Sequence, residues 1–99
     1  MPAIARIGDP ATQHPCGGQA NPAEGSPNVF VEGIAVHRLG DSNVAHSFNA
    51  PPTCVPHSTN LVSGSGSVFV NGKAVARVGD GYSCGMTITV GASTVYAGG

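Results

Sequence analysis

The stretch SGSVFVNGKAVARVGD, residues 65–80, places an Asn-Gly pair between two short apolar runs. This pair favours the type I′ turn of a two-residue β-hairpin, because both turn residues can adopt positive φ. Residues 26–41, SPNVFVEGIAVHRLGD, follow the same pattern with Glu32 and Gly33 at the turn. The sequence therefore predicts two copies of one hairpin unit.

A third copy is divided between the two ends of the chain. Residues 93–99 match the first half of the unit and residues 3–9 match the second half. A single hairpin cannot bury its apolar face alone, so repeated units are expected to pack against one another. We predict three pseudo-threefold hairpins around a common axis, in one domain of residues 1–99.

The composition favours an all-β domain. Only 9% of the 99 residues are charged, against roughly 25% in average domains, and there are 15 glycines and 8 prolines. The β-branched and aromatic runs at residues 29–31, 68–70 and 87–90 nevertheless predict short strands separated by turns. A chain of this length buries only a thin core, so an additional source of stability is expected.

Charge and hydropathy exclude several classes of partner. The net charge of −1 with four Lys and Arg residues leaves no basic surface for nucleic acid. No apolar stretch reaches the roughly 18 residues of a spanning helix, and the N-terminus lacks the pattern of a signal peptide. We expect synthesis in the cytoplasm without a signal peptide and no stable membrane insertion.

Each hairpin unit ends in Arg-X-Gly-Asp, at residues 6–9, 38–41 and 77–80. Asp starts loops by accepting hydrogen bonds from nearby backbone donors, and Gly permits positive φ. The simpler interpretation makes these Arg and Asp residues loop anchors and ion pairs. In the alternative, the Asp residues orient metal ligands in the loops that follow.

The loops that follow these motifs contain ligands of the kind that zinc prefers. Four or five residues after the last Asp of each unit stand His14, His46 and Cys84. If the loops converge on the axis, these side chains converge too, and His57 in the long insertion at residues 47–63 is the candidate fourth ligand. Three imidazoles and one thiolate would form a closed tetrahedral shell around one structural zinc ion.

The remaining histidine and cysteines fit this pattern less well. A single loop histidine is more often solvated than bound to metal, and His37 occupies the strand position that is Ala76 in the other copy, so it is interpreted as an ordinary strand histidine. The odd count of three cysteines argues against a fully paired disulfide framework. Cys16 and Cys54 are left as alternative ligands, a disulfide pair or buried small side chains.

These features together resemble the PAAR-repeat family over essentially the whole chain. The resemblance rests on the Arg-X-Gly-Asp endings, the SPNVFVEG hairpin, the Asp-X-X-X-X-His loops and the Cys84-Gly85 pair. The positions of the Pro-Ala-Ala-Arg consensus read Ile-Ala-Arg, Val-His-Arg and Val-Ala-Arg here, so the literal motif is only partly kept.

The resemblance implies a small cone with zinc near its point, bound by three His and one Cys. It also implies that the base caps the trimeric spike of a type VI secretion system, with one tip per trimer, or of a related contractile phage-type tail. A cap of this kind would sharpen the spike for piercing a target membrane, travel out of the cell on the contractile apparatus, and could carry a separate effector.

Three other function classes compete with this interpretation. A zinc hydrolase needs an open coordination position and a general base, whereas four protein ligands leave no vacancy and the only glutamates are Glu24 and Glu32. A fused effector would need residues that the repeats already occupy. A stand-alone adhesion or decoration module would differ in not binding a spike trimer. We therefore predict a structural protein without enzymatic activity.

Overall fold

A computed structural model of the chain describes residues 1–12, 19–50 and 53–98, with residues 46–50 and 53–56 described by their backbone. The molecule is elongated, 42 × 23 × 23 Å along its principal axes. Every regular element in the described residues is a β-strand, which confirms the predicted all-β class. Within those residues there is no helix of the length and apolarity needed to cross a membrane.

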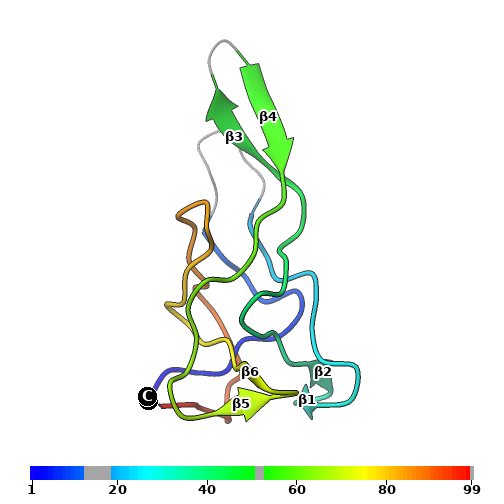
Figure 1. Cartoon of the computed structure of the whole chain (residues 1–99), viewed down its shortest axis with the longest axis vertical. Coiled ribbons are helices and arrows are strands. Elements are labelled where there is room, and N and C mark those ends of the chain that lie inside the picture. Colours follow the sequence, from blue (N-terminus) through cyan, green and yellow to red (C-terminus); the bar gives the residue numbers. More distant parts are fainter. Residues whose placement is uncertain (13–18, 51–52, 99) are drawn as a thin grey trace.

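Two short hairpins occupy the wide end of the molecule (Figure 1). Their strands are β1 Phe30–Val31 with β2 Ile34–Ala35, and β5 Phe69–Val70 with β6 Lys73–Ala74. Both turn residues of each hairpin have positive φ, from 53° to 80°, as a type I′ turn requires. The Asn-Gly and Glu-Gly turns were therefore predicted correctly.

The two ends of the chain lie beside each other as a third unit at the same end. Ala3 forms an antiparallel bridge with Tyr96, and the Ile4 amide donates to the Val95 carbonyl at 3.0 Å. The Val36 and Val75 amides make the equivalent bonds, to Val29 and Val68, in the two continuous hairpins. The terminal segments thus reproduce the backbone pairing of the other units.

The three units are joined by a closed ring of backbone hydrogen bonds. The Ala5 amide donates to Ala76, that of Ala76 donates to His37, and that of His37 donates to Ala5, at 2.9, 2.9 and 3.1 Å. All three residues are completely buried. Each unit therefore pairs with both others, which explains why no unit needs a long strand of its own.

Apolar residues fill the interior in two clusters. One lies against the hairpins and contains Ile4, Val36, Val75 and Ala97. The other continues toward the narrow end and contains Ala5, Ala11, Ala20, Leu61, Ala76, Tyr82 and Ile88. Small residues dominate because the three units approach one another closely around the axis.

Three glycines at equivalent positions permit close approach of the backbone segments within each unit. A Cβ atom on Gly25, Gly64 or Gly91 would lie 2.8, 3.0 or 2.6 Å from the carbonyl oxygen of Val36, Val75 or Ile4. In each unit the residue after the glycine donates its amide to that same carbonyl, at 2.8 to 2.9 Å. The sequence analysis overlooked these glycines, although their spacing relative to each repeat is constant.

The longest hairpin of the described residues was not predicted. It pairs β3 His46–Ala50 with β4 Thr53–His57, and Figure 1 shows it at the narrow end. Prolines at 51, 52 and 56 conceal its strand pattern, because proline cannot donate to a sheet ladder. The strand predicted at residues 87–90 is not formed. Thr87 and Ile88 form isolated bridges instead.

Candidate metal centre

Two of the predicted zinc ligands stand opposite each other at the root of the β3–β4 hairpin. His46 begins β3, His57 ends β4, and the two are register partners. Directly opposed residues of an antiparallel pair have Cβ atoms roughly 4.5–5.5 Å apart and share one face of the sheet. The backbone pairing therefore brings together a repeat loop and the insertion proposed to supply the fourth ligand.

Cys84 lies next to the segment that leaves this hairpin. Its Sγ is 3.2 Å from the Oγ1 of Thr59, two residues after His57, and the Ser83 amide donates to the Asn60 carbonyl at 3.1 Å. The loop around Cys84 is closed by hydrogen bonds between Tyr82 and Met86 and between Gly85 and Tyr82. The sulfur is thus held by a tight turn at the edge of the predicted site.

For the other candidate ligands, the structure describes only the backbone or nothing. His14 and Cys16 lie outside the described residues, and the side chains of His46 and Cys54 are likewise not described. Within the part of the chain that is described, no group of three or more His, Cys, Asp or Glu residues could hold a metal ion. His57 and Cys84, which come from neighbouring segments and offer nitrogen and sulfur donors, fit zinc chemistry. The four-ligand set remains a prediction.

The Asp residues of the repeats act as loop anchors. Each carboxylate accepts hydrogen bonds from the backbone amide and the guanidinium of the Arg three residues earlier. The Nη2–Oδ1 distances are 2.8 Å in Arg6–Asp9, 3.0 Å in Arg38–Asp41 and 3.1 Å in Arg77–Asp80. These hydrogen bonds raise the pKa of each Arg. The simpler of the two interpretations therefore accounts for the contacts seen.

The same arginines connect each unit to the turn of the next. Arg6 donates to the Glu32 carboxylate at 2.9 Å, Arg38 to the Asn71 side chain at 3.1 Å, and Arg77 to the Gly98 carbonyl at 3.2 Å. The three contacts run in one direction around the axis. They make the wide end a single connected ring rather than three separate hairpins.

Glu32 also fixes the C-terminal segment. Its carboxylate accepts hydrogen bonds from the backbone amides and hydroxyls of Ser93 and Thr94. These bonds, the Thr94 hydroxyl first among them, lower the pKa of Glu32 to about 2. Glu32 therefore stays ionised at any pH well above 2.

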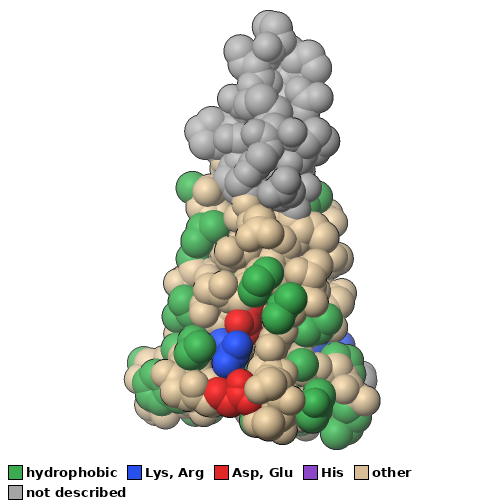
Figure 2. All heavy atoms as spheres, turned by 180° about the vertical axis from the view of Figure 1, so that it is seen from behind, with side chains coloured by type: hydrophobic (Ala, Val, Ile, Leu, Met, Phe, Trp, Pro, Cys, Tyr) green, Lys and Arg blue, Asp and Glu red, His purple; other side chains and the backbone are tan. Residues whose placement is uncertain are grey.

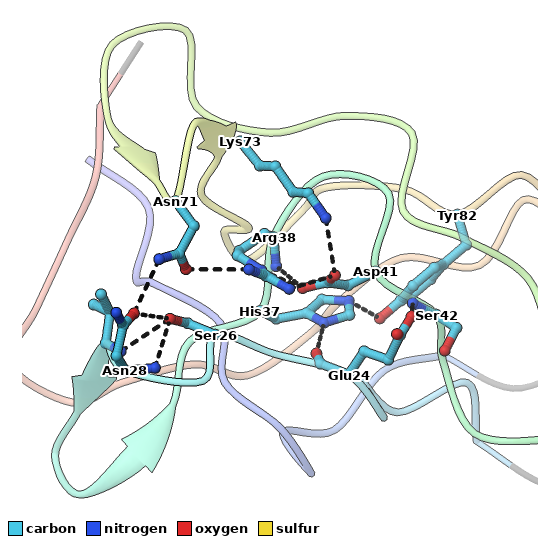
Figure 3. Close-up of polar contacts among 11 residues, drawn as sticks. Glu24, Ser26, Asn28, His37, Arg38, Asp41, Ser42, Asn71, Lys73 and Tyr82 are labelled. Atoms are coloured by element: carbon cyan, nitrogen blue, oxygen red, sulfur yellow. Dashed lines mark hydrogen bonds and ion pairs between the residues drawn. The ribbon is translucent and has the colours of Figure 1, made fainter.

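His37 is a buried structural residue rather than an ordinary strand histidine, which corrects the sequence analysis. Its Nδ1 lies 2.6 Å from the Glu24 carbonyl and its Nε2 lies 3.0 Å from the Tyr82 hydroxyl (Figure 3). A carbonyl can only accept, so Nδ1 carries the proton and Nε2 accepts from Tyr82. Alanine fills the other two positions of this layer, which leaves room for one imidazole on the axis.

Acidification is expected to destabilise the protein through His37. Burial lowers the pKa of His37 below its usual 6.5, so the unfolded chain binds a proton that the folded chain excludes. Stability should therefore fall as pH drops below about 6.5, by up to ~1.4 kcal/mol per pH unit for this group. Melting temperatures of wild type and His37→Gln between pH 5 and 8, at saturating zinc, test this. The variant should show a shallower slope; equal slopes would contradict the assignment.

A family model described as PAAR motif matches residues 16–90, which is more than half of the chain. No curated protein matches the chain.

Proposed function

Because the chain belongs to the PAAR-motif family, we propose that it caps the trimeric spike of a type VI secretion system, with one tip per trimer. The family consists of structural spike-tip proteins of contractile secretion machines, which are delivered out of the cell. Beyond the family, we propose that the machine is a type VI secretion system, that this protein caps its spike, and that the cap helps to pierce a target membrane. A contractile phage-type tail would present the same threefold partner.

Three equivalent aromatic side chains at the wide end carry this proposal. Phe30 in β1, Phe69 in β5 and Tyr96 in the terminal unit are 57, 59 and 50% exposed. Figure 2 shows apolar side chains at the same end of the molecule and others along its sides. Soluble monomers seldom expose aromatic residues in such a repeated arrangement without a partner, and aromatic residues are enriched at protein interfaces.

The symmetry of this surface indicates what kind of partner it fits. A trimeric spike presents three identical sites around its axis, and a pseudo-threefold monomer can occupy all three at once. Among the described strands, β1 and β5 each pair with one strand only, so their outer edges are available for a partner to cover. The ring of Arg-to-turn contacts holds the three hairpins at fixed spacing. Docking would therefore cost little conformational entropy.

We further propose that His14, His46, His57 and Cys84 bind one structural zinc ion. When bound, the ion would supply four-coordinate cross-linking rather than catalysis, because a full protein shell leaves no position for a substrate. The chain's own residues would fix the ligands: the β3–β4 pairing sets His46 against His57, and the loop closed by Tyr82 and Met86 holds Cys84. The point of the cone would then be stiffened under axial force.

Native mass spectrometry of the protein mixed with its cognate spike tests the capping role. We expect one tip bound per spike trimer. The double variant Phe30→Glu/Phe69→Glu should weaken binding at least ~30-fold, because central aromatic residues often contribute 2 kcal/mol or more to an interface. Three tips per trimer would rule out the pseudo-symmetric cap.

Val62→Glu is the matched control for this experiment. Val62 is 60% exposed, as much as the aromatic residues, but lies outside the three hairpins. Its substitution should leave spike binding unchanged. Equal weakening by the control and by the double variant would show that a general loss of apolar surface, and not the hairpin face, is responsible.

A further inference from the structure

Asn43 occupies a position where a polar side chain needs a reason. It is the second residue after the Asp of its unit, as Ala11 and Tyr82 are in the other units, and all three are buried. The equivalent residues both belong to the apolar core. Burying an amide costs free energy unless its groups are hydrogen-bonded, so the partners of Asn43 show what it does.

Those partners all lie in the segment that follows β4. Asn43 and Thr59 are joined by two hydrogen bonds from backbone amides. The Asn43 backbone amide donates to the Thr59 carbonyl at 2.9 Å, and the Thr59 backbone amide donates to the side-chain Oδ1 of Asn43 at 2.8 Å. The Ser58 hydroxyl donates to the Asn43 carbonyl at 2.7 Å. Asn43 therefore fixes the chain between His57 and Leu61.

The directions of these bonds follow from the chemistry of the groups. A backbone amide can only donate, so the Asn43 atom facing the Thr59 amide is the oxygen. The other amide atom, Nδ2, must then donate to Thr59 Oγ1, 2.8 Å away. Since that oxygen already accepts from Asn43, its own proton is available for the Cys84 sulfur at 3.2 Å.

We propose that Thr59, oriented by Asn43, is a positioning residue that donates a hydrogen bond to the Cys84 thiolate and so prepares this sulfur to bind metal. The inference rests on the proposed metal centre and adds two residues to it. A thiolate has no proton to donate, so in the metal-bound form the hydroxyl is the donor. Outer residues that hold a metal ligand commonly change metal affinity about 10-fold to 100-fold when they are removed.

The test uses Co²⁺ as a probe in the full chain. Thr59→Val keeps the shape of the side chain but removes both the donor to Cys84 and the acceptor of the Asn43 side-chain amide. Thr59→Ser keeps both. We expect Thr59→Val to bind Co²⁺ at least ~10-fold more weakly and to move the sulfur-to-cobalt charge-transfer band to lower energy, because the sulfur loses a bond that stabilises its electron pairs. Thr59→Ser should restore both properties.

Thr12→Val is the matched control. The Thr12 hydroxyl also donates to a sulfur, that of Met86 at 3.3 Å, on the same loop as Cys84. Its loss should leave the charge-transfer band in place. If Thr59→Val and Thr12→Val behave alike while wild type binds Co²⁺, the role of Thr59 is refuted and the metal centre stands.

A second readout separates this inference from the metal centre. If wild type shows no cobalt–sulfur band, the metal centre is refuted. The hydrogen bond is then judged by a double-mutant cycle in metal-free protein, in which Thr59→Val is combined with Cys84→Ala. Thr59→Val should lower the melting temperature less in the Cys84→Ala background than in wild type, because the acceptor of its hydrogen bond is already gone. Equal losses in both backgrounds would overturn the inference.

Discussion

Removal of zinc by a chelator is expected to lower the melting temperature more than any single substitution that leaves the proposed zinc ligands in place. A ligand present at 1,000 times its dissociation constant stabilises the folded state by about 4 kcal/mol. In a domain of this size about 1 kcal/mol corresponds to roughly 4–8 °C, so the loss should be on the order of 16–30 °C. Calorimetry with and without chelator measures it, and elemental analysis should find about one zinc per chain.

Two neighbouring substitutions give this experiment its control. Cys84→Ser removes the proposed thiolate, and Ser83→Ala changes the exposed residue beside it. The first should release zinc and reproduce the melting temperature of the chelated protein, whereas the second should do neither. A protein that is folded, free of metal and indifferent to chelator would contradict the zinc centre.

The fold was largely predictable because local chemistry and repetition agree. The Asn71-Gly72 and Glu32-Gly33 turns require positive φ, and the sequence signals this directly. The joining of the chain ends follows from the same repeat, since residues 3–9 and 93–99 each match only one half of the hairpin unit. Where three copies of one pattern must pack together, the sequence predicts the architecture even though the strands are only two residues long.

Long-range packing explains what the sequence did not predict. His37, Ala5 and Ala76 occupy equivalent positions and are all buried. Only their packing around one axis shows that this layer has room for a single imidazole. Asn43 likewise has an apolar counterpart in each of the other units. In both cases the signal was a polar residue at a repeat position that is apolar elsewhere, which could have been read from the sequence.

For the candidate site, the structure bears on the placement of three predicted ligands. Repeat spacing pointed to His14, His46 and Cys84, and His57 was chosen as the histidine available outside the repeats. The pairing of His46 with His57 depends on the β3–β4 hairpin, which the sequence analysis did not anticipate because of its prolines. Spacing therefore identified ligand types, while the element that brings them together required the structure.

Gly91→Ala is expected to be the most damaging of the small substitutions in the interior. The added Cβ would lie 2.6 Å from the Ile4 carbonyl oxygen, 3.1 Å from Val78 Cγ2 and 3.2 Å from the Ala3 Cβ. That carbonyl accepts the Ala92 amide at 2.8 Å, so it cannot retreat without breaking a bond between the two halves of the terminal unit. Overpacking of this kind costs roughly 1–3 kcal/mol and occasionally more. A fall in melting temperature of about 4–24 °C should follow.

The repeat supplies a graded series and a control for this prediction. Gly25→Ala and Gly64→Ala place the Cβ 2.8 and 3.0 Å from the equivalent carbonyl oxygens, so their costs should decrease in that order after Gly91→Ala. A Cβ on Gly81 meets nothing closer than 3.8 Å, and Gly81→Ala should leave the melting temperature within a few degrees of wild type or raise it slightly. If the four variants have the same melting temperature, close approach of the backbones within each unit does not limit stability. The three glycines would then need another explanation.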